Sequence, residues 1–492
     1  MESSLSEHRP AFSGQEPRIA SSNAILAVLM VGTFLAPLDS SIVNIALPGI
    51  ATDLGVTITA VSWVASAYLL TSAALLLSMG RLGDMWGLRS LYVGGLLIFG
   101  TGSAACALSH SLPVLIGARV LQAVGASMLF AAGPAIVVRT FPPEKRGAAL
   151  GVISLAVAAG LTVGPALGGV LVGLFGWPSI FIINIPLSVV AAIVAWRILP
   201  AEQPAGGAFD VLGAVLAGGA LLSLIGGFTE ATTFGLLSIE IIGAFTASAI
   251  LGVSFIWWER QAATPMVDLR LFRSRDFSAG ISAAVLAYMA LFSIIFTMPF
   301  YLMRARGLAP ETAGLLLTST PLAMALLAPY AGRLSDRMGS RGLSTGGLLV
   351  LAAGLGAMSI LTIESPIWFV GGCLFTVGAG MAVFQTPNTS SVMHATPRSS
   401  AGVGSAFIAE ARNVGMAVGI ALTAAVVTSQ MGGAVGMLDG TGVLAVKPAA
   451  ELLAGMSVAM RVAVALTMAA AALSWFIRDE RPAGVESRGP GG

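Results

Sequence analysis

The sequence predicts an all-α integral membrane protein: two six-helix bundles related by an internal repeat, plus two inserted helices, or fourteen transmembrane helices. Three observations support this. Of the 492 residues 56% are apolar and only 10% are charged, and the mean hydropathy is +0.90. Runs of about 20 apolar residues recur along the chain, the length of a membrane-spanning helix and about twice that of a barrel strand. A segment of the first half also returns in the second half.

The apolar runs divide into fourteen spans, and the charges between them predict their orientation. Lysine and arginine favour the cytoplasmic side of a membrane. If the N-terminus is cytoplasmic, nineteen of these residues lie in cytoplasmic loops and tails and four lie outside. We therefore expect a multi-pass protein of the inner (cytoplasmic) cell membrane with both termini in the cytoplasm. The predicted spans are 23–47, 60–80, 90–109, 112–138, 147–174, 178–199, 211–229, 235–258, 278–303, 309–331, 343–363, 366–392, 401–430 and 453–477.

The internal repeat predicts how these spans group. The segment Gly80–Arg89 returns as Gly332–Arg341, a shift of 252 residues. We therefore expect an N-terminal bundle at 23–199 and a C-terminal bundle at 278–478. Two inserted helices and a cytoplasmic linker fill 200–277, and cytoplasmic tails occupy 1–22 and 479–492. Repeated halves with a binding site at their interface are typical of secondary transporters.

The first span contains a carboxylate, Asp39, within Leu38–Pro48. A helix over 23–47 crosses a bilayer core of about 30 Å and places Asp39 about 12 Å from its end. A charge at that depth costs a few kcal/mol, which indicates a functional residue. The alternative is a shorter span with Asp39 among the lipid headgroups. Arg119 lies in the same layer of 112–138, so the two are expected to pair directly or through water.

Several classes of function lack their residues. Neither lysine of the chain, Lys145 or Lys447, belongs to a G-x-x-x-x-G-K-[ST] phosphate loop, which argues against direct use of ATP. The two cysteines lie in separate spans and the three histidines have no metal-ligand spacing. We expect no enzyme activity, metal, cofactor or nucleic-acid partner. The expected partners are a small molecule, protons and the lipid bilayer, with the chain working as a monomer.

Several motifs together resemble the major facilitator superfamily, and more narrowly its fourteen-helix drug:proton antiporter branch, over about residues 22–478. Gly80–Arg89 and its second copy resemble the pattern G-x-L-x-D-R-x-G-R-[KR], although Met85 and Leu88 replace two basic residues. Leu38–Pro48 resembles the branch motif L-D-x-T-I-V-N-x-A-L-P, with serine in place of threonine. The remaining matches are Arg119–Gly125 with R-x-x-x-G, Gly160–Gly169 with the antiporter motif of the fifth span, and Trp177, Ile182–Pro186 and Leu269–Arg273.

The resemblance implies two devices that control conformation. A gating loop would latch the two halves when the outer side is open. An antiporter helix would use a stripe of small residues on one face, with a proline that favours a bend. A simple tight turn and ordinary helix packing are the alternatives. The gating-loop residues are Gly80, Asp84, Arg89, Gly332, Asp336 and Arg341, and the antiporter-helix residues are Gly160, Gly164, Pro165 and Gly168.

The resemblance also implies a cavity between the halves. Glu410, at a position that is commonly uncharged in the family, is expected to be a second carboxylate of this cavity; the alternative is a contact with an arginine of a cytoplasmic loop. Arg412 is two residues further on and on another face of the helix, which it shares with Ser405, Gly415 and Gly419, and it is expected to be structural. Packing alone is the alternative for the aromatic residues. The expected cavity residues are Glu410, Trp63, Tyr68, Gln122, Phe384, Gln385 and Asn413.

The resemblance implies proton-coupled export of drugs or antibiotics by alternating access, and a cavity with one or two carboxylates favours amphipathic, cationic cargo. In this prediction Asp39 and Arg119 couple transport to protons, and Asp39 takes up a proton from outside and releases it inside. The first alternative is a proton-coupled exporter of a metabolite such as a siderophore, lipid or amino acid. A nutrient importer of the same fold is the second, and a transport-inactive sensor or membrane enzyme is the third.

Overall fold

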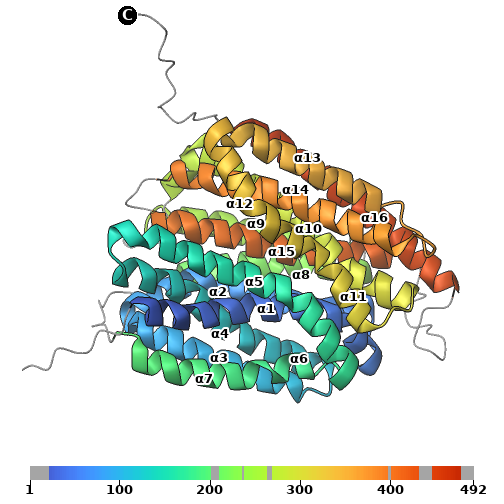
Figure 1. Cartoon of the computed structure of the whole chain (residues 1–492), viewed down its shortest axis with the longest axis horizontal. Coiled ribbons are helices and arrows are strands. Elements are labelled where there is room, and N and C mark those ends of the chain that lie inside the picture. The colour runs from blue at the N-terminus through green and yellow to red at the C-terminus, as the bar shows by residue number, and fades with distance from the viewer. Residues whose placement is uncertain are drawn as a thin grey trace, which may run out of the picture.

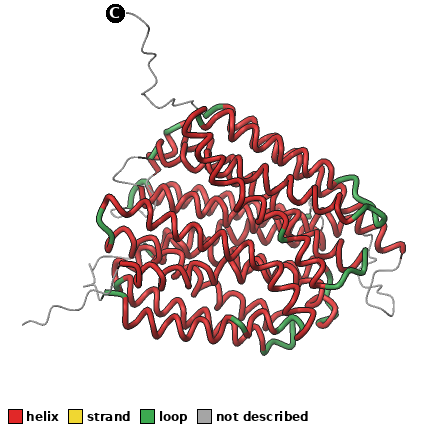
Figure 2. The backbone as a smooth tube through the Cα atoms, viewed as in Figure 1, coloured by secondary structure: helices red, strands yellow, loops and turns green. Residues whose placement is uncertain are grey.

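The computed structural model describes residues 22–200, 210–234, 238–262, 269–396, 401–430 and 446–477, and over these residues it contains helices and loops without strands (Figures 1 and 2). The predicted tails at 1–22 and 479–492 lie almost entirely outside this part of the chain. The first helices are α1 (Ser22–Asp53), α2 (Ile58–Trp86), α3 (Leu88–Ala107), α4 (Leu112–Thr140), α5 (Pro143–Phe175), α6 (Ser179–Ile182), α7 (Asn184–Ile198), α8 (Val211–Phe234) and α9 (Ile239–Glu259). They are followed by η1 (Leu269–Arg273), α10 (Arg275–Phe300), η2 (Tyr301–Ala305), α11 (Pro310–Leu317), α12 (Ser319–Met338), α13 (Ser340–Met358), α14 (Ile367–His394), α15 (Ala401–Gln430) and α16 (Val446–Trp475).

Each of the fourteen predicted spans coincides with a helix or with two consecutive helices. Among the described residues, thirteen helices are long and apolar enough to cross a membrane, and α2 contributes the shorter apolar stretch Ala60–Leu76. Two elements join end to end in three spans: α6 with α7, α10 with η2, and α11 with α12. The predicted all-α membrane fold is therefore confirmed.

The helices pack in two groups with the same internal pairing. In the first group α1 packs on α5, α4 on α2 and α3, and α3 on α7. In the second group α10 packs on α15, α14 on α12 and α13, and α13 on α16. Figure 1 shows the groups as two parallel layers of helices, blue to green below and yellow to red above. The inserted helices α8 and α9 pack on each other, and α8 also contacts α2 and α15, one helix from each group. The domain bounds given above remain a prediction.

The repeated segment forms the same turn in both groups. Gly87 and Gly339 join consecutive helices with φ of +88° and +87°, a conformation that glycine adopts without a Cβ penalty. The arginine that follows each turn stacks on a tryptophan near the end of its own group. The guanidinium carbon of Arg89 lies 4.2 Å from the Trp196 ring, and that of Arg341 lies 4.0 Å from the Trp475 ring.

Glycines set the distance between α5 and α1. A Cβ at Gly160 would lie 2.6 Å from the carbonyl oxygen of Phe34, and one at Gly168 would lie 2.5 Å from a methyl carbon of Ile45. At Gly164, between them, a Cβ would overlap the Ser41 side chain. Both helices can therefore approach only because these positions have no side chain.

The two groups also touch each other at the end of the bundle where α1 ends. A Cβ at Gly169 of α5 would lie 2.5 Å from the carbonyl oxygen of Pro310, and one at Gly314 of α11 would overlap the carbonyl of Pro165. Arg304 of η2 donates a hydrogen bond to the carbonyl of Pro48 in α1. Backbone-to-backbone contact of this kind closes this end of the bundle between the groups.

Candidate functional site

Asp39 lies at the centre of a buried polar cluster in the first group. Its carboxylate accepts hydrogen bonds from Arg119 Nη1 at 2.5 Å, Gln122 Nε2 at 2.8 Å and Asn184 Nδ2 at 2.9 Å. Asp39 is 0% exposed and Arg119 1% exposed. Asp39 and Arg119 thus form a direct ion pair. Because Asp39 lies well inside the 32-residue helix α1 and is enclosed by protein, the headgroup alternative does not describe it.

Five helices hold Arg119 and its neighbours in place. Arg119 of α4 donates from Nε to the carbonyl of Val64 in α2, and from Nη1 to Gln122 as well as to Asp39. Gln122 in turn donates to Ser103 of α3, while Asp39 and Asn184 come from α1 and α7. None of these side chains is among the described buried groups that lack a hydrogen-bond partner, and their hydrogen bonds lower the cost of burying the charges. The cluster therefore ties most of the first group together.

Tyr68 of α2 covers the Arg119 side of the cluster. The guanidinium carbon of Arg119 lies 4.1 Å from the centre of the Tyr68 ring, within the range of a cation–π contact. The Tyr68 hydroxyl donates to the carbonyl of Ala36 at 3.3 Å. Tyr68 is therefore in contact with the ion pair on one side and with α1 on the other.

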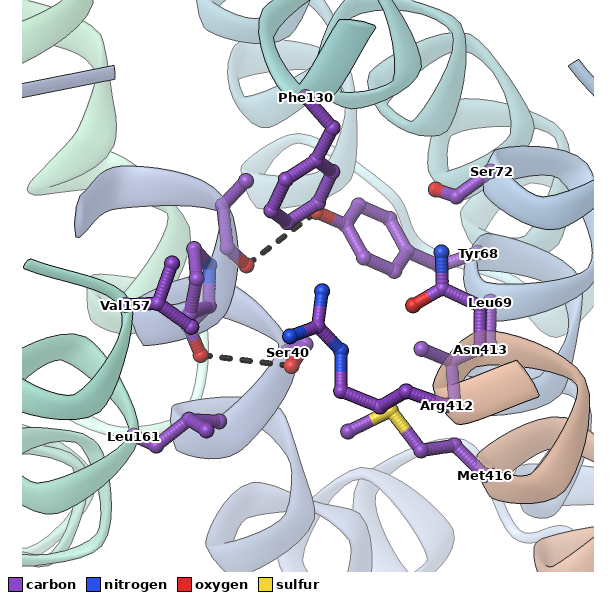
Figure 3. Close-up of a pocket in the computed structure, with 12 residues that line it drawn as sticks. Ser40, Tyr68, Leu69, Ser72, Phe130, Val157, Leu161, Arg412, Asn413 and Met416 are labelled. Carbon is purple, nitrogen blue, oxygen red and sulfur yellow. Dashed lines mark hydrogen bonds between the residues drawn. The ribbon is translucent and has the colours of Figure 1, made fainter. Parts of the chain in front are cut away.

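A small pocket lies against Tyr68, between the two groups (Figure 3). The first group supplies most of its wall and α15 of the second group supplies the rest. Asp39 and Arg119 are not among its lining residues, but Tyr68, whose ring contacts Arg119, is. The lining residues are Ala36, Pro37 and Ser40 of α1, Tyr68, Leu69 and Ser72 of α2, Phe130 of α4, Val157 and Leu161 of α5, and Arg412, Asn413 and Met416 of α15.

Two of the residues expected to line a cavity, Tyr68 and Asn413, do line this pocket. Gln122 belongs instead to the Asp39 cluster. Phe384 is 1% exposed and packs inside the second group. Its backbone is so close to Gly347 of α13 that a Cβ added to that glycine would lie 2.5 Å from the Phe384 nitrogen. Trp63 and Gln385 are partly buried and lie outside the lining.

Glu410 also lies outside the lining of this pocket. Its Oε2 atom is buried and has no hydrogen-bond partner among the described residues. Arg412, expected to be structural, is the charged residue among the twelve described residues that line the pocket. Arg412 shares a helix face with Ser405, Gly415 and Gly419, and this spacing predicted a packed face. The spacing does not indicate which helix packs against that face.

Sequence reasoning also missed Asn184 and Ser103. Asn184 belongs to the stretch Ile182–Pro186 that carried part of the family resemblance, so a signal was present but no role was attached to it. Ser103 is one small polar residue in an apolar span, and only its 2.8 Å contact with Gln122 distinguishes it. The gating-loop acids Asp84 and Asp336 lie on described helices, but their side chains are outside the described part of the structure.

Two packed groups of membrane-spanning helices with a pocket between them define a multi-pass membrane transporter. The Major Facilitator Superfamily profile matches residues 29–420 and 281–491. The chain belongs to the major facilitator superfamily, whose members transport small molecules and are not enzymes.

Similar proteins fall into more than one functional group. The riboflavin transporter RibZ of Clostridioides difficile is 36% identical over 81% of this chain and 86% of its own length. The tetracenomycin C resistance and export protein of Streptomyces glaucescens is 31% identical over 93% and 92%. The multidrug resistance protein Stp of Mycobacterium tuberculosis is 31% identical over 81% and 74%.

A solved structure supports the fold. A bacterial homolog of the human lysosomal transporter Spinster, in an inward-facing and unoccupied conformation, has a TM-score of 0.68. It is 17% identical to this chain and covers 92% of it and 96% of itself. At this identity the likeness concerns the fold alone.

Proposed function

We propose that this protein is a proton-coupled exporter of amphipathic drug-like or antibiotic-like molecules, working by alternating access in the inner cell membrane with both termini in the cytoplasm. The observation that carries the proposal is the buried Asp39–Arg119 pair next to a pocket between the two halves. An ionisable pair at membrane depth is costly, and proton relays are among its recognised uses. Relatives described as resistance and export proteins support export as the direction.

Tyr68 gives the proposed coupling a physical route. Its ring contacts Arg119 and also forms part of the pocket wall. Cargo that displaces Tyr68 would change the surroundings of Arg119, and thereby the balance between an ionised and a protonated Asp39. Conversely, protonation of Asp39 removes its attraction to Arg119 and frees the guanidinium to move. The proton site and the cargo site then communicate through one aromatic side chain.

The proposal leaves out the cationic cargo that the sequence led us to expect. That expectation depended on an apolar cavity with one or two carboxylates, Asp39 and Glu410. No acidic residue is among the described residues that line the pocket.

The test uses proteoliposomes with an imposed pH gradient and fluorescent aromatic dyes of positive, neutral and negative charge. The wild-type protein is expected to drive at least one dye against its gradient. Asp39→Asn is expected to abolish this gradient-driven transport but to keep dye exchange without a pH gradient, which needs no net proton movement. The exchange assay also shows that the variant has folded.

Asp53→Asn is the matched control. Asp53 is the last residue of α1, and its Oδ2 accepts a 2.9 Å hydrogen bond from Trp177 Nε1, a role that an amide oxygen can also fill. This variant is expected to retain gradient-driven transport. The proposal is wrong if Asp39→Asn accumulates dye like the wild type, or if the wild type moves no dye under a pH gradient.

A second candidate is transport of a vitamin or other metabolite. It is favoured by the 36% identity to a protein described as a riboflavin transporter. A heterocyclic vitamin and an aromatic antibiotic make similar demands on a pocket lined by Tyr68 and Phe130. Including riboflavin among the compounds tested, in both directions across the membrane, separates the two candidates.

A further inference from the structure

The side chain of Arg412 enters the pocket from α15. Figure 3 shows its guanidinium in the middle of the pocket, between Ser40 and Tyr68. Met416 lies one turn further along the same face of α15 and also lines the pocket, and Asn413 completes this wall. The guanidinium therefore lies at the junction of the two halves, where cargo must pass if it moves between them.

Arg412 has no anionic partner among the described residues. It makes no hydrogen bond or ion pair with them; its guanidinium carbon lies 5.9 Å from the ring of Phe130, and Tyr288 of α10 is also near enough to interact with its charge. Glu410 is two residues away on the same helix, which directs the two side chains to different faces. The carboxylate of Asp39 is already neutralised by Arg119. The described wall of the pocket thus has a net positive charge.

A positive charge in a site surrounded by membrane-spanning helices is costly unless something neutralises it. In this conformation the free space in the pocket is about 20 Å³, enough for about one water molecule, so a larger neutralising group enters only when the two halves move apart. A planar guanidinium offers several N–H donors and suits carboxylates, phosphates and other flat or multidentate oxygen anions. An arginine in this position favours an anion that arrives with the cargo.

The rest of the pocket fits an aromatic body. Tyr68 and Phe130 provide ring surfaces, and Leu69, Val157 and Leu161 provide aliphatic ones. Ser40, Ser72 and Asn413 add hydrogen-bonding groups at separate points of the wall.

We propose that Arg412 selects cargo with an aromatic body and an acidic group, such as a carboxylate or an ionised phenol, and that cationic drugs are poor cargo for this protein. This inference rests on the proposed function for the direction of transport, but not for the binding preference itself. It reverses the charge that the sequence predicted for the cargo.

The test compares three probes with one ring system and different charges: anthracene-9-carboxylate, 9-anthracenemethanol and 9-anthracenemethylammonium. Binding to the purified full-length protein is measured by probe fluorescence in detergent without any pH gradient. A charge-assisted hydrogen bond within the pocket corresponds to a preference of about tenfold or more for the carboxylate over the ammonium. Arg412→Gln is expected to remove this preference, and Arg412→Glu to reverse it.

Arg461→Gln is the matched control, since Arg461 is an exposed arginine of α16 outside the pocket. It removes the same charge from the protein and is expected to leave the preference unchanged. Thermal unfolding of every variant separates a folding defect from a lost contact. Equal binding of the three probes, tighter binding of the ammonium, no binding of the carboxylate to the wild type, or an unchanged preference in Arg412→Gln would each overturn the inference.

Failure of this inference can be distinguished from failure of the proposed function. The binding assay needs neither protons nor transport. Loss of coupling in the proteoliposome experiment would leave the carboxylate preference intact. Conversely, a protein that pumps cations under a pH gradient would retain the proposed function while contradicting the role of Arg412.

Discussion

Asp39 shows how one residue can be both structural and functional. Its carboxylate holds together α1, α4 and α7 through Arg119, Gln122 and Asn184. Removing one partner of a buried ion pair leaves the other charge unpaired, which costs about 3–5 kcal/mol in proteins. Substitutions of Asp39 or Arg119 therefore combine effects on stability and on coupling. Neutral members of the cluster allow these effects to be separated.

Asn184→Ala provides such a separation. The variant removes the 2.9 Å hydrogen bond to Asp39 but leaves the ion pair with Arg119 in place. Because a hydrogen bond to a charged group contributes about 1.5–3 kcal/mol, we expect a lower thermal midpoint and weaker proton coupling, but not its loss. The midpoint is measured by tryptophan fluorescence and coupling by the proteoliposome assay. Unchanged stability would show that Asn184 contributes little to holding the carboxylate.

At the scale of the helix, α5 is shaped by the positions where it has no side chain. Gly160, Gly164 and Gly168 face α1, whereas Gly169 on a neighbouring face meets α11 of the other group. The same helix therefore packs tightly within its own half and also against the opposite half. α15 of the second group also packs tightly within its own half, because Gly415 and Gly419 lie against the backbone of α10. The antiporter role of α5 remains a prediction, since tight packing alone explains these glycines.

A pair of alanine substitutions tests this packing. Gly160→Ala places a Cβ 2.6 Å from the carbonyl oxygen of Phe34, so the helices must move apart, and we expect a loss of about 1–3 kcal/mol in stability. Gly117→Ala, in α4, meets nothing within 4 Å. It is expected to be neutral or to stabilise by up to about 1 kcal/mol through helix propensity. Thermal unfolding of both variants checks the difference, and equal midpoints would contradict the packing argument.

At the scale of the whole molecule, the two halves share a helix arrangement but differ in their buried charged residues. A shift of 252 residues carries Asp39 onto Leu291, which is 3% exposed in an apolar environment. Gly380 packs on Gly347 and Leu351 as Gly125 packs on Gly95 and Phe99, and this correspondence carries Arg119 onto Leu374, which is buried. The ion pair therefore belongs to the first half alone. The second half contributes Arg412, which we propose selects the cargo, whereas the first half contributes the ion pair that we propose couples transport to protons.

This arrangement predicts the electrical character of transport. If one proton enters for each anion exported, two positive charges move inward per cycle. An inside-negative potential contributes about 2.3 kcal/mol per charge per 100 mV, or about 4.6 kcal/mol for two charges. Export of an aromatic sulfonate, which stays ionised, is expected to speed up under an imposed potassium diffusion potential. An unchanged rate would contradict the exchange of one entering proton for one exported anion.

Much of this molecule can be predicted from the sequence, because a membrane restricts what a chain can do. A bilayer core accepts helices of about 20 apolar residues, so their number follows from hydropathy. The repeat of Gly80–Arg89 at Gly332–Arg341 indicates two related halves, and a carboxylate amid apolar residues marks Asp39 as unusual. These inferences need only local composition and spacing.

The neighbours of each side chain were decided by the tertiary structure. Glu410 and Arg412 are two residues apart on one helix, and the sequence favoured Glu410 as the cavity residue. The rotation of α15 against α2 places Arg412 in the pocket lining instead, and Asp39 is not among the lining residues. In an apolar chain nearly every helix face can be buried, so hydrophobic periodicity does not fix helix rotation. Only the packing of glycines, aromatic rings and hydrogen bonds between helices does.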